Sequence, residues 1–236
     1  MNPSVRRGII AGGIAIALLV VLGAAGAFLL GSHHAPAPLA LNSPAAAGTP
    51  NSLAGAWTVA AGSEAGYRVR EQFVNQPAPT EAVARTTKVS GGLQVQSAGG
   101  SALKASGLHI TVDLSTLQSQ DKYATFQTYQ RDFFIRTIYL ETPQYPNADF
   151  KADSVTLADG ISSAAVSINV TGTLTVHGVS KPVTTQLQIQ LNGAQLEAAG
   201  SMTVDMRDFN IMPPDISFTK AEPGVVIEYH LLLAHA

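Results

Sequence analysis

One acidic residue occupies a position where its charge needs a partner. Glu71 stands in an alternating row whose other members, Tyr67, Val69 and Phe73, are apolar or aromatic. A carboxylate that faces the interior costs several kcal/mol unless it is paired or neutral. We therefore expect Glu71 to pair with an arginine at the mouth of the folded domain. The alternatives are contact with the polar head group of a ligand and, third, a catalytic role.

A second charged site is the adjacent pair Arg131-Asp132, which Phe133 follows directly. The pair lies within Ser119–Ile138, where Ser119 is a candidate helix cap and aromatic residues recur at three- and four-residue steps. That spacing predicts one short helical segment. We expect Arg131 and Asp132 to form an ion pair that fixes this segment over the rest of the domain, with ligand contact as the alternative.

Sequence motifs for catalysis and for metal binding are absent. The chain has no cysteine, which excludes disulfides, thiolate zinc sites and a cysteine nucleophile. Its six histidines are scattered, and the His33-His34 pair offers too few ligands to hold a metal. There is no nucleophile elbow, zinc-protease helix or phosphate-binding glycine loop. The sequence therefore predicts a binding protein, with no catalytic residues, no metal and no cofactor other than a possible bound lipid.

The elements that must position these side chains are best seen in one hairpin. Residues Val166–Val176 carry apolar side chains or glycine at even positions and Ser, Asn or Thr at odd positions. Residues Val183–Leu191 alternate in the same way, and the segment His177–Pro182 between them supplies glycine and proline. A period of two is typical of strands with one buried face, and these turn residues predict a tight connection.

The same alternation recurs along most of the remaining chain. We count roughly eight to ten short strands without the spacing of parallel βαβ units, which predicts an antiparallel all-β fold. Most of these strands offer a single apolar face. A closed barrel of about eight strands, with one short helical insertion, satisfies that pattern without exposed edges.

The N-terminal region differs from the rest in composition. Residues 1–7 carry Arg6 and Arg7, and residues 8–31 hold 24 uncharged residues, enough for a helix of roughly 36 Å that spans a bilayer. The basic residues precede the span, so we expect a single-pass anchor in the cell membrane with the N-terminus cytoplasmic. A cleavable signal peptide is the competing interpretation, although Pro38 directly follows the candidate site Ala35–Ala37.

The segments after the anchor complete the predicted organisation. Residues 32–52, rich in proline and alanine, are expected to form an extended linker that holds the domain away from the membrane. Residues 53–236 are expected to form one extracytoplasmic barrel domain. The formal net charge of −2 and the pI of about 6.3 provide no basic field, so nucleic acid is not an expected partner.

One stretch resembles a known family. Residues Leu174–Val183, LTVHGVSKPV, are similar to the signature hairpin of the YceI-like family of polyisoprenoid-binding proteins. Shorter pieces agree in the same order, namely Trp57-Thr58-Val59, Thr111–Leu114, Arg131-Asp132, Tyr145-Pro146 with Phe150, and Arg207–Ile211. The chain departs from the family pattern at Glu71, where a histidine often ends the second strand, and at Asn210, which replaces a glycine.

The resemblance implies a lipocalin-like barrel whose lumen holds an isoprenoid chain, such as a polyprenyl lipid or an isoprenoid quinone, in the bacterial cell envelope. Small residues in the inward rows leave space, which either neighbouring side chains or such a ligand would fill. The candidate head-group contacts are Glu71, Arg131 and Asp132. The candidate lumen walls are Tyr67, Val69, Phe73, Ile110, Val112, Phe126, Phe133, Phe150, Ile168, Val170, Leu187, Ile189, Met202, Val204, Ile227 and Tyr229.

This set of expectations leaves two functions open. The first is a membrane-anchored carrier or storage protein for an isoprenoid or other amphiphilic lipid. The second is a non-enzymatic module for envelope stress or protein interaction, with a filled barrel that presents its polar outer faces to a partner. The oligomeric state is not determined by the sequence.

Overall fold

The computed structural model describes residues 33–43, 52–74, 76, 78–122, 128–157 and 160–236. The predicted cytoplasmic tip and membrane anchor, residues 1–31, lie outside the described residues, as does Phe126. Within the described part of the chain, no helix has the length and apolar character needed to cross a bilayer.

Strands make up most of the described chain. They are β1 (Gly55–Val59), β2 (Glu64–Phe73), β3 (Thr80–Thr86), β4 (Val89–Gly99), β5 (Ala102–Asp113), β6 (Gln118–Ser119), β7 (Asn147–Leu157), β8 (Val166–Val176), β9 (Val179–Asn192), β10 (Gln195–Asp205), β11 (Asp215–Ile216) and β12 (Thr219–His235). The helical elements are the 3₁₀ turns η2 (Leu114–Thr116) and η4 (Met206–Phe209), the α-helix α2 (Tyr129–Phe134) and the π-helical turn η3 (Ile135–Tyr139).

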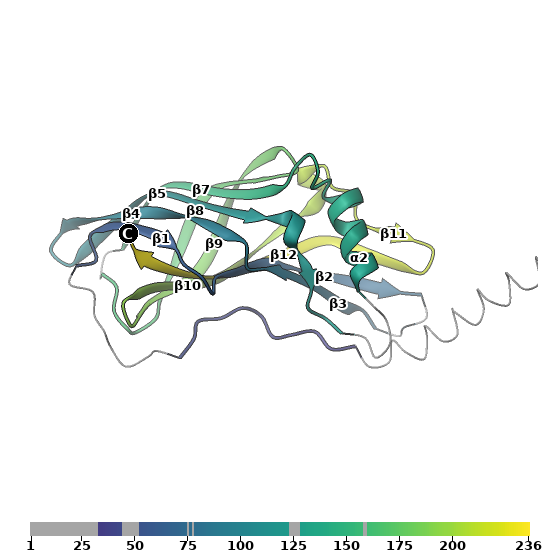
Figure 1. Ribbon diagram of the computed structural model, residues 1–236, viewed down its shortest axis with the longest axis horizontal. Coiled ribbons are helices and arrows are strands. Elements are labelled where there is room, and N and C mark those ends of the chain that lie inside the picture. The colour runs from purple at the N-terminus through teal and green to yellow at the C-terminus, as the bar shows by residue number, and fades with distance from the viewer. Residues whose placement is uncertain (1–32, 44–51, 75, 77, 123–127, 158–159) are drawn as a thin grey trace, which may run out of the picture.

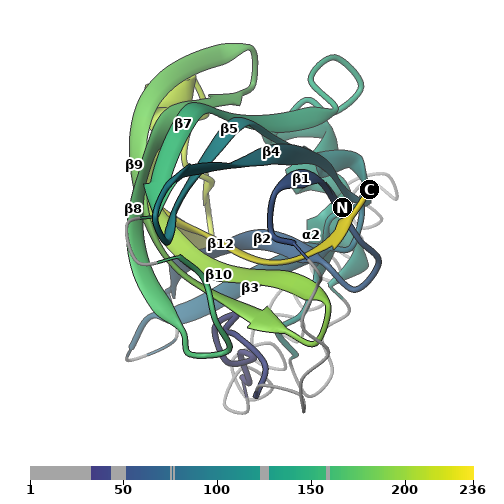
Figure 2. The same cartoon turned by 90° about the vertical axis from the view of Figure 1, so that its left-hand side faces the viewer.

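The strands form one antiparallel sheet that closes on itself (Figure 2). Closure occurs at β1, where Trp57 pairs with Leu93 of β4 on one side and with His235 of β12 on the other. Strands β1 and β2 both pair with β12, one after the other along its length, and together occupy one position in the barrel wall. Strands β4 and β3 pair with β1 and β2 and occupy the next position, so the wall of the barrel is eight strands around. The prediction of a closed all-β barrel with one short helical insertion is confirmed.

The hairpin that the sequence predicted is strands β8 and β9. Its register runs from Val166 opposite Ile189 to Val176 opposite Val179. The turn consists of His177 and Gly178, with φ of 52° and 73°. Two successive residues with positive φ are typical of the type I′ turn, whose twist matches that of the flanking strands.

The helical insertion begins later in the chain than the sequence indicated. The prediction that Ser119 caps a helix is wrong, because Gln118 and Ser119 form β6 and pair with Arg85 and Ala84 of β3. Pairing with a neighbouring strand overrides the local helical spacing here. Helix α2 begins only at Tyr129, continues into η3, and lies across one end of the barrel (Figure 1).

Residues 33–43, expected to be part of a free linker, instead lie along the outside of the barrel wall (Figure 1). We call this segment the strap. Backbone hydrogen bonds of 3.0 and 2.9 Å join His34 to Lys122, and the amide of Asn42 donates to Glu197 at 2.7 Å. The strap is extended as predicted. An extended chain makes no internal hydrogen bonds, so its carbonyl groups can accept hydrogen bonds from donors on the barrel, and these bonds attach the strap to the wall.

Two arginines, one of them buried, hold the middle of the strap. Arg68 and Arg85 donate to the carbonyl oxygens of Pro36 and Ala37, each at 2.6 Å. Both guanidinium groups also bind the buried carboxylate of Glu228, at 2.7 and 2.8 Å. The strap therefore completes a buried ion network, and its first half is fixed to the domain.

Candidate functional site: an apolar cavity in the barrel

The barrel interior holds a cavity of about 150 Å³. Apart from Asp149, Thr185 and Tyr229, the residues that line it are apolar. They are Ala65, Leu93, Ala105, Leu108, Ile110, Val112, Ala148, Phe150, Val155, Leu157, Ile168, Val170, Leu174, Leu187, Ile189, Leu196, Ala198, Met202, Ile227, Leu231 and Leu233. A cavity with such walls excludes water and favours an apolar guest.

Ten of the sixteen residues that we predicted to form lumen walls line this cavity. They are Ile110, Val112, Phe150, Ile168, Val170, Leu187, Ile189, Met202, Ile227 and Tyr229. They come from six different strands, so closure of the sheet brings them together. Their contact with a ligand stays a prediction.

The other predicted wall residues lie elsewhere. Tyr67, Val69 and Val204 pack into clusters of side chains at the α2 end of the barrel, beyond the cavity. Phe73 lies at the far end of β2, where it pairs with Thr219. Phe133 does not line the cavity, because α2 turns this side chain outward and leaves it 55% exposed.

Several wall residues were missed because two strands change phase. Strand β5 presents Leu108, Ile110 and Val112 to the cavity, all at even positions, but also Ala105, at an odd position. The change occurs at Gly107, which has a φ of 61°, next to an irregularity in the pairing of β4 with β5. A bulge shifts a strand by one residue and so reverses which side chains face inward. The glycine itself was the available signal.

The same change of phase occurs in the neighbouring strand β7. Ala148 and Phe150 line the cavity at even positions, whereas Val155 and Leu157 line it at odd positions. Simple alternation along β7 therefore predicted only the first half of its inward row. Val155 and Leu157 are large and apolar, and they continue the cavity lining toward the end of the barrel opposite α2.

One section of the barrel wall is not joined by backbone hydrogen bonds. Residues 149–151 of β7 pair with residues 173–175 of β8. Residues 152–157 and 166–172 are all described by the structure, and no ladder pairs connect these two stretches. Val155 and Leu157 on one side and Ile168 and Val170 on the other line the cavity, so the cavity borders this unpaired section of wall.

Two hydroxyl groups belong to the cavity lining. The hydroxyl of Tyr229 lies 2.7 Å from that of Thr185, and burial raises the pKa of Tyr229 to about 12 although this hydrogen bond lowers it. The phenol is therefore neutral at physiological pH. A Cβ atom at Gly200 would lie 2.7 Å from the same hydroxyl and 2.6 Å from the carbonyl oxygen of Gln186. The absence of a side chain at Gly200 thus makes room for Tyr229.

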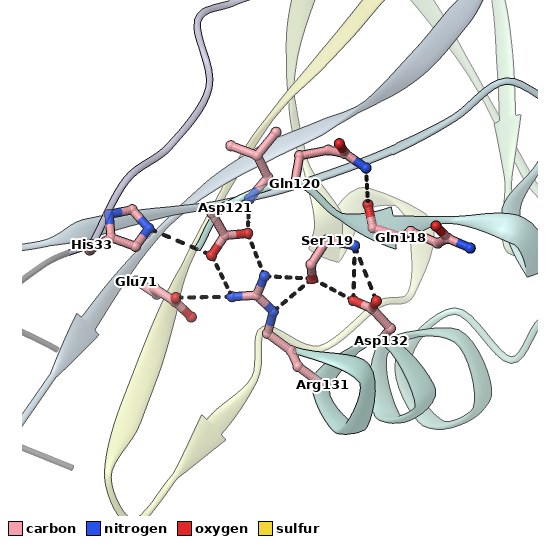
Figure 3. Close-up of polar contacts among 9 residues, drawn as sticks. His33, Glu71, Gln118, Ser119, Gln120, Asp121, Arg131 and Asp132 are labelled. Atoms are coloured by element: carbon pink, nitrogen blue, oxygen red, sulfur yellow. Dashed lines mark hydrogen bonds and ion pairs between the residues drawn. The ribbon is translucent and has the colours of Figure 1, made fainter. Parts of the chain in front are cut away.

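The three candidate head-group residues meet in one polar cluster at the α2 end (Figure 3). Arg131 donates to Asp121 at 2.9 Å and lies 3.5 Å from Glu71, which gives Glu71 the arginine partner that its sequence position required. Asp132 accepts a hydrogen bond of 3.1 Å from the amide of Ser119 and also binds its hydroxyl. The helix is thus fixed through contacts of both residues with the segment around β6.

The electrostatics of this cluster are those of a buried ion network. Asp121 is 2% exposed, and it also accepts from the amide of Val83 at 3.1 Å. Burial alone would lower the pKa of Arg131, but its hydrogen bond to Asp121 and the charge of Asp121 outweigh burial and raise it. Burial also raises the pKa of Tyr67, which lies within the field of the same charges. Arg131 therefore stays charged and holds α2 to the barrel.

Neither site has an arrangement of side chains suited to a metal. Within the residues that the structure describes, no three His, Asp or Glu side chains lie close enough to hold a metal ion. The arrangement of the described residues supports retention of an apolar group in the cavity.

Comparisons with known proteins agree with the geometry. A family model described as "YceI-like domain" matches residues 57–231. A UPF0312 protein of Pseudomonas putida is 31% identical over 126 residues, which are 50% of this chain and 60% of that protein. The match thus spans less than two thirds of the curated relative.

Two solved structures are similar. A polyisoprenoid binding domain from Saccharophagus degradans, implicated in plant cell wall breakdown, has a TM-score of 0.56 at 16% identity, covering 78% of this chain and 99% of that one. BcnA of Burkholderia cenocepacia has a TM-score of 0.47 at 22% identity, covering 70% of this chain and 95% of that one. The first of these structures shares the fold.

Proposed function

The chain belongs to the YceI-like domain family, and on that premise we propose that it binds an isoprenoid or other amphiphilic lipid, with the apolar tail in the barrel cavity. The observation that carries this proposal is the cavity itself, whose walls are apolar except at Asp149, Thr185 and Tyr229. Each CH₂-sized group that enters contributes about 0.8 kcal/mol. The protein acts by retention of the lipid, without a chemical step.

The size of the cavity limits how much of a tail it holds without rearrangement. An apolar cavity of about 150 Å³ accepts a guest the size of benzene, so a longer chain requires more room. The unpaired section between residues 152–157 of β7 and 166–172 of β8 supports such widening. Separation of the wall there breaks no ladder hydrogen bonds, whereas separation of the fully paired β8 and β9 would break many.

The polar end of the lipid is proposed to lie toward the α2 end. Glu71, Arg131 and Asp132 are brought together there, and the buried side chain of Tyr67 lies within the field of their charges. Membrane anchoring through residues 8–31 and an extracytoplasmic barrel are part of the same proposal. They rest on the uncharged stretch and on the basic residues that precede it.

Native mass spectrometry of the full chain in detergent tests the proposal. The wild-type protein should retain one lipid, and Ala198→Leu should lose it, because Ala198 lines the cavity and the larger side chain occupies the space. Ala98→Leu adds the same bulk at an exposed position of β4 that does not line the cavity, and it is the matched control. Ala198→Val, a smaller change, serves if the leucine variant unfolds.

The outcomes separate the two functions. A lipid that is lost from the cavity variant and kept by the control supports the carrier. Wild-type protein that repeatedly carries no lipid contradicts it and favours the interaction module with a filled barrel.

A further inference from the structure

The large hydrophobic side chains that are exposed to solvent gather at one end of the barrel. Across the described ranges, every such residue belongs to α2, η3, β11 or a loop at that end. They are Val74, Tyr129, Phe133, Phe134, Ile138, Met212, Ile216 and Phe218. Figure 1 shows the elements that carry or adjoin them, namely α2, β11 and the beginning of β12, at the same end of the molecule. We call these residues the apolar face.

The contacts within this end support a continuous surface. The amide of Val74, which follows β2, donates to the carbonyl of Phe218 at 3.1 Å, so two segments far apart in sequence present adjacent apolar side chains. Lys220 pairs with Asp215 at 2.8 Å, so these two charges of the β11–β12 hairpin neutralise each other. The opposite end of the barrel consists of turns such as Gly99–Ser101 and contributes none of the large exposed hydrophobic residues in the described part of the chain.

The strap begins at the same end of the barrel as the apolar face, so the preceding part of the chain connects to the barrel there. His33 lies 3.5 Å from Asp121, within the cluster that holds α2, and His34 is paired with Lys122. Only Ser32 separates His33 from the uncharged stretch of residues 8–31. Consecutive Cα atoms are 3.8 Å apart, so two residues of chain reach at most about 8 Å beyond His33. If this stretch spans a bilayer, the connection is too short to hold the α2 end of the barrel away from the lipid.

We infer that the apolar face docks on the surface of the lipid bilayer, with the aromatic side chains of Tyr129, Phe133, Phe134 and Phe218 at the level of the head groups. Tyrosine is enriched at that level because its ring is apolar and its hydroxyl is polar, and phenylalanine on the apolar side of an interfacial surface inserts at the boundary between head groups and acyl chains. Large exposed apolar surfaces on a soluble domain mark interaction sites. The short connection from the strap to residues 8–31 identifies the bilayer as the occupant.

This orientation adds a membrane-facing side to the proposed function. It rests on that proposal, because the proposed anchor attaches the domain to the membrane. The candidate head-group residues Glu71 and Arg131 lie at the same end as the apolar face. A lipid that moves between bilayer and barrel would therefore find the polar cluster at the membrane side and the apolar cavity beyond it. Docking thereby aligns the axis of the barrel with the path of the lipid.

The absence of cysteine allows a direct test on the full chain. Phe218→Cys and, at the opposite end, Ser101→Cys each receive a fluorescent label, and the proteins are reconstituted in vesicles that contain brominated phosphatidylcholine. Quenching by the brominated lipid should be at least fivefold stronger at position 218, while iodide in the water should quench position 101 more strongly. Phe134→Cys provides a second position on the apolar face.

Equal quenching of both positions by each reagent overturns the inference. Native mass spectrometry of the same samples keeps this result apart from the lipid-binding proposal. A domain that shows the predicted quenching but retains no lipid supports docking and contradicts the proposed cargo. A domain that retains lipid but has equal quenching contradicts docking alone.

Discussion

The two ends of this barrel are built from the same strands but differ in what fills them. Toward the end opposite α2, large aliphatic side chains line a cavity of about 150 Å³ that reaches into the middle strands of the barrel as far as Leu174 and Met202. The α2 end is packed by Met206, Phe209 and Ile211 together with η3, and the ion network of Arg131 fastens α2 across it. The difference shows that the cavity region is suited to an apolar group, whereas the α2 end is packed with side chains and covered by the helix.

The contrast also separates two uses of polar side chains. In the cavity half, the few polar groups such as Thr185 and Tyr229 satisfy each other. At the α2 end, charged residues carry structural contacts, because a helix laid across an open barrel buries little apolar surface on its own. None of the residues Tyr129–Phe134 of α2 is buried, so its position depends on Arg131 and Asp132.

Removal of the ion network should have the largest effect. Arg131→Met leaves Asp121 buried without its cation, and breaking a buried pair in this way costs about 3–5 kcal/mol of unfolding free energy. Urea denaturation measures this loss. Arg207→Met removes the exposed pair with Asp205 and should change stability little. Equal stability of the two variants would show that α2 is held by other contacts.

Matched truncations should reveal the difference in packing between the two ends. Ile211 and Ile110 are both 8% exposed, but only Ile110 lines the cavity. We expect Ile211→Ala to cost about 4 kcal/mol and Ile110→Ala about 2 kcal/mol, because a side chain beside a void has fewer contacts to lose. Calorimetry of both variants provides the comparison, and equal losses would mean that the cavity is as well packed as the α2 end.

Ionisation of Tyr229 should have a smaller effect on the unfolding free energy, and this effect depends on pH. The folded pKa of Tyr229 is raised to about 12, above the usual value of 10.0. Its contribution is complete below pH 10 and is lost as the pH rises toward 12, because the unfolded chain releases the phenolic proton first. The unfolding free energy should therefore fall by about 1.4 kcal/mol per pH unit in this window for this group.

The variant Tyr229→Phe isolates that contribution. The slope of stability against pH between 10 and 12 should become shallower, while measurements between pH 6 and 8 should show no slope from this group. Tyr67, whose pKa burial also raises, keeps part of the slope in the variant. An unchanged slope would indicate that Tyr229 ionises in the folded state as readily as in the unfolded chain.

How much of the site was predictable follows from how local each signal is. The positions Ile168, Val170, Leu187 and Ile189 were found because an unbroken alternation and a tight turn define the β8–β9 hairpin. Leu157 and Ala105 were missed because the alternation changes phase in β5 at Gly107 and in β7, the strand paired with it. The partner of Glu71 was anticipated as an arginine, but only the folded chain shows that it is Arg131, 60 positions along the sequence.

The sequence alone established the features that depend on neighbouring residues: the two-residue period, the His177-Gly178 turn, and from these the closed barrel and its family. The tertiary structure decided what depends on distant contacts. It placed residues 33–43 on the barrel wall, began the helix at Tyr129 and left an apolar cavity between the strands. These outcomes follow from long-range pairing and packing, in which residues far apart in the chain compete for the same hydrogen bonds and the same space.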